Sequence, residues 1–247
     1  MTYKDFISAC LNYSFNKSCW KDSLLPDTFK WFNAACSILL AANEGDPNCL
    51  GGIRPGEAPR YRKTLDEWWD IKDHDTALKR MNDLIDTGMS ARFEHTMLIF
   101  KEYREKVKIV KSTGKKTNSE ILQEKYIKYG SDAILGWDLC RAIIITNWCH
   151  ICGYLSFEEM MNICVTAGKM LQDKFSCWDE VMESYMCGFF YWVNPHSDEE
   201  KIKYKLRFHI YKTLKEKKGP FASIDFMTPL SFELSNEEKS KLNVTSK

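Results

Sequence analysis

Glycine and proline are scarce in this sequence, with 12 and 7 residues among 247. This scarcity excludes collagen-like and low-complexity chains and disfavours an all-β architecture, which needs many turns. An excess of either charge is also missing, because 35 Lys and Arg stand against 34 Asp and Glu and leave a net charge of +1. No field of one sign therefore points to nucleic acid or to an anionic membrane surface.

Apolar residues, in contrast, are abundant, at 44% of the chain with 13% aromatic. Such a composition can build a sizeable core, which excludes a disordered chain. The length fits one large domain, or a main domain with a small attachment.

The cysteines and the start of the chain bear on the cellular compartment. Residues 1–11 carry Lys4 and Asp5 and contain no apolar stretch of signal-peptide length. Most of the 10 cysteines lie at apolar helical positions, such as Cys36 and Cys164. A free cysteine behaves as a small buried hydrophobic residue, so we expect reduced core thiols in a cytoplasmic protein.

The most apolar window covers residues 133–152 and is long enough to raise the question of a membrane span. Asp138 and Arg141 lie near its middle, and charges inside a bilayer are costly even when they are paired. We therefore predict a buried central helix, and no membrane contact.

Apolar residues recur at helical spacing from Asp27 to about Lys218, which predicts an all-α fold: a globular array of about eight helices around the central one. Capping-box patterns at Thr64, Ser156, Ser176 and Ser197 predict helix starts, and residues 48–62 read as a connector. The expected organisation is an N-terminal segment (1–26), a helical domain (27–218) and an extended tail (219–247). Within the tail, residues 221–234 could form a strap laid over the helices or one short strand.

Asp138 and Arg141 are the leading candidates for a functional site, because residues three apart share one face of a helix. They could form a polar centre that faces a pocket, or a structural ion pair that fixes helix packing. We predict that they pair with each other or with helix-end groups, close to Trp178 and Tyr185 on the following helices. The candidate set is Trp137, Asp138, Arg141, Tyr154, Glu159, Trp178 and Tyr185.

Other candidate chemistry is weaker. Cys149 and Cys152 form a CxxC motif, but zinc would need a second ligand pair, so we interpret them as core thiols and expect no metal or cofactor. Glu158 and Glu159 stand in a first helical turn, where the helix dipole favours carboxylates without any catalytic role. No nucleophile elbow or phosphate-binding loop occurs. The lysine-rich stretch from 101 to 128 lacks a known nucleic-acid module, so such a partner is not expected.

Several motifs stand in a recognisable order: Gly136-Trp137-Asp138-Leu139-Cys140-Arg141, then Gly153-Tyr154-Leu155, then Ser176-Cys177-Trp178, then Tyr185-Met186-Cys187-Gly188. Over residues 28–193 the chain resembles the bacterial family known as domain of unknown function 1266. The resemblance implies a bacterial, intracellular, largely helical protein and brings no established activity. One departure is the turn Gly88-Met89-Ser90, where the family often has a Gly-His-Arg-like turn, so no role for a histidine carries over.

Two functions remain open from the sequence. The first is a non-enzymatic factor, of an immunity or regulatory kind, that acts by contact with another protein; it rests on the absence of recognisable catalytic motifs. The alternative is an enzyme or small-molecule binder with a polar pocket around Asp138, Arg141, Tyr154 and Tyr185.

Overall fold

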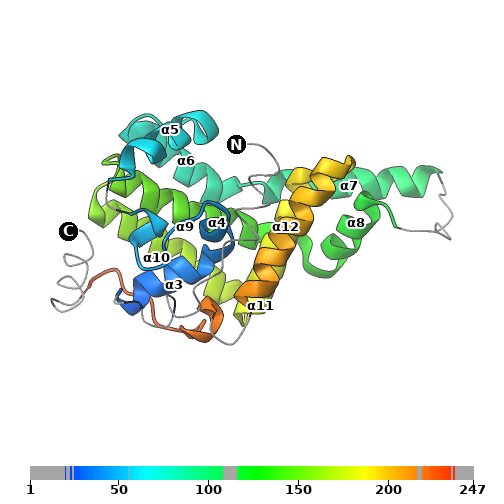
Figure 1. Cartoon of the computed structure of the whole chain (residues 1–247). Coiled ribbons are helices and arrows are strands. Elements are labelled where there is room, and N and C mark those ends of the chain that lie inside the picture. The colour runs from blue at the N-terminus through cyan, green and yellow to red at the C-terminus, as the bar shows by residue number, and fades with distance from the viewer. Residues whose placement is uncertain are drawn as a thin grey trace.

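A computed structural model describes residues 20, 23, 25–54, 56–107, 116–215, 219–234 and 236. Within these residues the chain forms helices and turns and no strand, which confirms the predicted all-α class (Figure 1). The α-helices are α3 (Asp27–Ala35), α4 (Ser37–Ala42), α5 (Ala58–Trp69), α6 (His74–Asn82), α7 (Ser90–Val107), α8 (Asn118–Tyr129), α9 (Leu135–Ile151), α10 (Phe157–Lys174), α11 (Trp178–Val193) and α12 (Asp198–Leu214).

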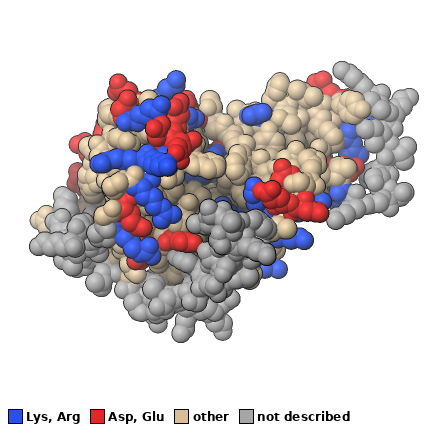
Figure 2. All heavy atoms as spheres, turned by 45° about the horizontal axis from the view of Figure 1, so that its top comes forward, with Lys and Arg blue, Asp and Glu red and all other residues tan. Residues whose placement is uncertain are grey.

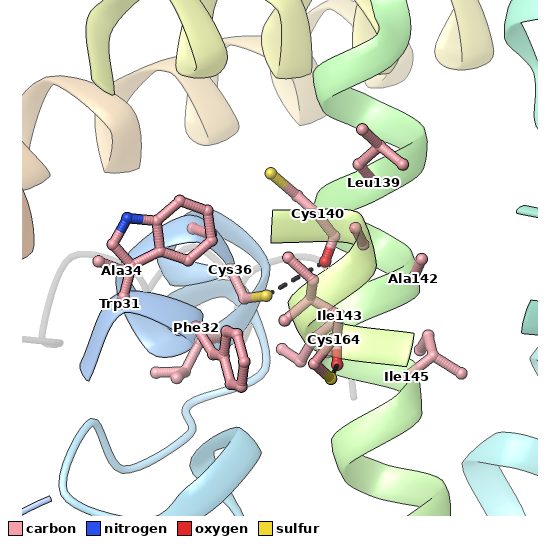
Figure 3. Packing of buried hydrophobic residues seen from close by; sticks show 14 of the residues in the cluster. Trp31, Phe32, Ala34, Cys36, Leu139, Cys140, Ala142, Ile143, Ile145 and Cys164 are labelled. Atoms are coloured by element: carbon pink, nitrogen blue, oxygen red, sulfur yellow. Dashed lines mark hydrogen bonds between the residues drawn. The ribbon is translucent and has the colours of Figure 1, made fainter. Parts of the chain in front are cut away.

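Helix α9 is the central helix that the apolar window predicts. Its residues from Gly136 to Cys149 are all buried, and α10 and α11 pack along it most extensively. Figure 3 shows side chains of α3 and the following turn facing α9. There the Cys36 thiol donates to the carbonyl oxygen of Cys140 at 3.1 Å, and Cys164 donates to that of Ile143 at 3.6 Å. These cysteines therefore pack as small core residues.

Helices α7 and α8 extend away from the rest of the molecule in Figure 1. They share a smaller apolar cluster made by Phe93, Met97 and Leu122 with Ala133 and Ile134. The last two residues belong to η3, a 3₁₀ turn (Gly130–Ile134) that leads directly into α9. This turn joins the α7–α8 pair to the central helix.

Helix starts follow the predicted capping boxes in part. Ser156 and Ser197 cap α10 and α12 as expected, with reciprocal hydrogen bonds to Glu159 and Glu200. The start expected at Thr64 is wrong, because α5 begins at Ala58 with a proline in its first turn, inside the expected connector. The helix expected after Ser176 forms as α11 from Trp178, but the capping box does not, because the N-cap is Cys177 and its side chain makes no capping hydrogen bond.

The tail packs on the helices as a strap and not as a strand. It begins with the short helix η4 (Pro220–Ala222) and continues in turns and irregular backbone to residue 234. The indole nitrogens of Trp31 and Trp178 donate to the carbonyl oxygens of Phe226 and Ile224, at 2.7 and 2.9 Å. Leu230, which belongs to this segment, is buried against α10 at Gly168. The rest of the expected tail, apart from residue 236, and most of the expected N-terminal segment lie outside the described residues.

Two surface properties complete the fold. Among the described helices, none combines the length and the apolar character that crossing a bilayer requires. Figure 2 shows basic and acidic side chains interspersed on the face it presents, in keeping with the balanced composition.

Candidate functional site

The Asp138–Arg141 pair forms as the helical spacing predicts. Arg141 Nη2 lies 2.6 Å from Asp138 Oδ1, and Arg141 Nε donates to the carbonyl oxygen of Trp137 at 3.0 Å. Only 1% of Asp138 and 9% of Arg141 is exposed. A buried carboxylate of this kind needs all its acceptor positions occupied, because desolvation is costly.

The second oxygen of Asp138 binds the start of α7. Asp138 Oδ2 accepts hydrogen bonds from the backbone N–H groups of Met89 and Ser90, both at 2.9 Å, and from Ser90 Oγ at 2.7 Å. These N–H groups belong to a helix N-terminus, where free donors and the helix dipole favour a negative charge. Asp138 therefore caps α7 from a helix that lies far away in sequence.

Gly88 makes this approach possible. A Cβ atom there would collide with the carboxylate of Asp138, and the backbone φ of +49° lies in the region that favours glycine. Gly88 follows η2 (Asp83–Thr87), a π-helical turn that ends the α6 run. The turn Gly88-Met89-Ser90, where the sequence departs from the pattern of the family it resembles, thus binds the carboxylate of Asp138.

Arg141 lies between two indole rings. Its guanidinium carbon is 4.4 Å from the ring centre of Trp137 and 5.7 Å from that of Trp69. Burial lowers the pKa of Arg141 from its ordinary value, while the neighbouring Asp138 carboxylate acts in the opposite direction. The ion pair and the aromatic rings together restrain the guanidinium.

A cavity of about 690 Å³ opens beside Arg141. It lies between α4, α5, α6, η2, α9, α11 and α12, so its wall combines segments from most of the described chain. Its aromatic lining consists of Trp68, Trp69, Trp137, Trp148, Phe189 and Trp192. We call it the arginine pocket, because Arg80, Arg141 and Arg207 also line it.

Two of these arginines have no acidic partner among the described residues. Arg80 donates through Nε to the carbonyl oxygen of Trp69 at 2.9 Å. Arg207 donates to the carbonyl oxygen of Ile38 at 3.4 Å and lies 4.8 Å from the ring centre of Phe189. Within the described part of the chain, Asp83 is the one acidic side chain of the lining. The pocket therefore carries an excess of positive charge.

The candidate residues predicted from the sequence separate into different places. Tyr185 stays with the pair: it is buried, its ring centre is 5.0 Å from that of Trp137, and burial raises its pKa to about 12. Trp178 instead packs against Trp31 and Phe226 beneath the strap. It is not among the residues that line the pocket.

Tyr154 and Glu159 also lie outside the pocket lining. Glu159 caps α10, and its Oε1 is 2.7 Å from Nε2 of His74 at the start of α6. Tyr154 belongs to the turn after α9 and packs at the edge of the core. The alternative hypothesis places a pocket around Asp138, Arg141, Tyr154 and Tyr185, and of these four residues Arg141 is the one in the lining of the arginine pocket.

Cys149 and Cys152 are buried free thiols. Burial raises their pKa to about 12 and about 11, which keeps them protonated and disfavours metal binding. No group of three or more metal-binding side chains occurs within the described residues.

Sequence reasoning missed Arg80, Arg207 and the Gly88 turn. A signal existed at Trp68-Trp69, since two consecutive residues of a helix cannot both face one core. Trp68 is 74% exposed, which is unusual for tryptophan.

Comparison with known proteins places the chain in a family. A family model described as "Protein of unknown function (DUF1266)" matches residues 64–226, more than half of the 247 residues. The chain belongs to the DUF1266 family. The DUF1266 match runs from α5 to the strap, so it begins later and ends later than the resemblance drawn over residues 28–193. It contains all three arginines of the pocket, Gly88 and Asp138. No curated protein and no solved structure matches the chain.

Proposed function

We propose that this DUF1266 protein binds a negatively charged small molecule in the arginine pocket. The observation that carries the proposal is the pair of guanidinium groups, Arg80 and Arg207, that line a cavity without an acidic partner among the described residues. This is the small-molecule alternative of the sequence analysis, with a pocket that Arg141, Arg80 and Arg207 line and that Tyr154 and Tyr185 do not.

The chemistry of arginine supports an oxyanion as the bound group. A guanidinium presents a planar set of donors that matches the oxygens of a phosphate or carboxylate. Arg141 is held in place by Asp138 and by two indole rings, so little conformational freedom is lost when a ligand binds to it. Arg80 and Arg207 add charge from α6 and α12.

Thermal unfolding with inorganic pyrophosphate tests the proposal. We expect millimolar pyrophosphate to raise Tm at constant ionic strength, because a ligand that binds only the folded state stabilises it. Arg80→Gln or Arg207→Gln should raise the pyrophosphate concentration that gives a half-maximal shift by about 10- to 100-fold, since each removes a charge-assisted contact. Arg92→Gln is the matched control, because Arg92 is exposed on α7 and outside the pocket lining.

The readout is the shift caused by pyrophosphate and not Tm itself, because Arg80 also bonds the end of α5. Arg80→Lys and Arg207→Lys, which keep the charge, should retain part of the shift. No shift in the wild type, or equal loss in Arg92→Gln and Arg207→Gln, would refute the proposal.

Contact with a protein partner, as an immunity or regulatory factor, is the second candidate. It is supported by large apolar side chains exposed on α7 and α8, of which Ile99, Tyr103 and Ile127 are the most exposed. A pull-down from the source cytoplasm, repeated with Ile127→Asp, tests it: a partner lost with that substitution supports contact there, and a partner retained argues against it.

The proposed setting is the bacterial cytoplasm. It is supported by the free thiols of the described cysteines, most of which are buried in apolar surroundings.

A further inference from the structure

We infer that the ligand of the arginine pocket joins a flat aromatic ring to its anionic group. This inference rests on the proposed function and adds the chemical class of the ligand. Its starting point is the distribution of tryptophan: the chain contains 8, and Trp68, Trp69, Trp137, Trp148 and Trp192 all line this one cavity.

Size argues against a bare oxyanion. The cavity holds about 690 Å³, whereas a water molecule occupies about 30 Å³ of liquid and phosphate only a few times that. A bare anion would therefore leave most of the aromatic wall in contact with water. Pockets of this volume usually enclose a ligand of metabolite or drug size.

The walls offer ring surfaces that are not already used by the core. The ring of Trp192 is tilted against those of Trp137 and Phe189, with 6.0 Å between the ring centres in each pair, yet 53% of Trp192 is exposed. Trp68 is more exposed still, at the end of α5. Trp148 differs from these two residues, because it is buried and its indole nitrogen donates to the carbonyl oxygen of Gly51. Its ring therefore fixes part of the pocket wall and offers little free surface to a ligand.

Charge and ring surface lie next to each other. The guanidinium of Arg141 is 4.4 Å from the ring centre of Trp137, and that of Arg207 is 4.8 Å from the ring centre of Phe189. A ligand can therefore stack its ring on an indole while its anionic group bonds an adjacent arginine. Base–aromatic stacking is favourable for any flat heteroaromatic ring, because each has a π face.

Two kinds of molecule share this chemistry, namely nucleoside phosphates and aromatic carboxylates. Isothermal titration calorimetry distinguishes them with adenosine 5′-monophosphate and indole-3-acetate. Each is compared with its counterpart without the ring, ribose 5-phosphate and acetate, and adenosine serves as the ring without charge. We expect at least one ring-bearing anion to bind about tenfold or more tighter than its counterpart.

The variant Trp192→Leu separates stacking from charge. This substitution should lower the affinity for the ring-bearing anion by about 5- to 100-fold and leave the affinity for ribose 5-phosphate unchanged. Tyr103→Leu, an exposed aromatic residue on α7 outside the pocket, is the matched control and should change neither affinity. Circular dichroism of both variants checks that the fold is retained.

The outcomes distinguish the two proposals. If ring-bearing and ring-free anions bind equally, or if pyrophosphate stabilises the protein but no ring-bearing anion binds, the inference is overturned and the proposed function stands. If adenosine binds as tightly as its phosphate and Arg207→Gln changes neither affinity, anion recognition itself fails.

Discussion

Asp138 stabilises two parts of the structure with one carboxylate. One oxygen pairs with Arg141, and the other accepts three hydrogen bonds from Met89 and Ser90. The structural hypothesis for the pair therefore applies to Asp138, and the functional hypothesis applies to Arg141. Asp138 is buried behind the wall, whereas Arg141 contributes to the pocket lining.

Removal of this carboxylate should destabilise the protein strongly. Asp138→Ala leaves Arg141 and the first N–H groups of α7 without their acceptor, and we expect the free energy of unfolding to fall by roughly 3–5 kcal/mol. Asp138→Asn should cost less, because its amide oxygen can still accept the backbone N–H groups. Urea unfolding measures both values.

Asp173→Ala is the matched control for that measurement, because Asp173 is exposed on α10. It should unfold like the wild type. An Asp138→Ala protein as stable as the control would show that the buried pair does not hold α7 and α9 together.

At the scale of elements, a second ion pair joins two helix starts. His74 begins α6, and its Nε2 lies 2.7 Å from Glu159 Oε1 in the first turn of α10. The hydrogen bond with Glu159, followed by that with Asp75, raises the pKa of His74 above its ordinary 6.5. The bond with His74, followed by those with Ser156, lowers the pKa of Glu159 to about 2.

These shifts predict a pH dependence of stability. The His74 contribution is fully present below pH 6.5 and is lost as the pH rises through its raised folded pKa. The Glu159 contribution is present above its ordinary pKa of 4.5 and is lost as the pH falls towards 2. The pair thus stabilises the fold most between these ordinary values.

Thermal unfolding of His74→Gln checks the direction. Its deficit in Tm relative to the wild type should be larger at about pH 5.5 than at about pH 8.5. The effect should be small, since both side chains are partly solvated. His95→Gln, exposed on α7, should show no such trend; a His74→Gln deficit that grows with pH would contradict the assignment.

Helices were predictable where local patterns decide them, and less so elsewhere. The apolar run of α9 and the caps at Ser156 and Ser197 depend on neighbours in sequence, and all three predictions are confirmed. Thr64 has the same residue types as a capping box, but it lies within α5, where Thr64 Oγ1 donates to the carbonyl oxygen of Arg60. A short motif cannot tell a helix start from a helix interior when a proline upstream has already begun the helix.

At the scale of the whole molecule, the candidate site could be predicted only in part. The spacing of Asp138 and Arg141 predicts their pairing, because both lie on one helix. Arg80 and Arg207 come from α6 and α12, and only the packing of both helices around α9 brings them to one cavity. Helical periodicity shows which face of a helix is buried but not which distant segment covers it, so the contacts of Trp178 with Trp31 and Phe226 could not be predicted.

A crystal structure grown with tungstate tests the central claim most directly, because tungsten is located by its anomalous scattering. The account predicts a tungstate ion in the arginine pocket, within hydrogen-bond distance of at least two of Arg80, Arg141 and Arg207. Arg207→Gln crystals should show that site weakened or lost. Tungstate bound only outside the pocket, or Arg80 and Arg207 closed in ion pairs with carboxylates of the chain, would contradict it.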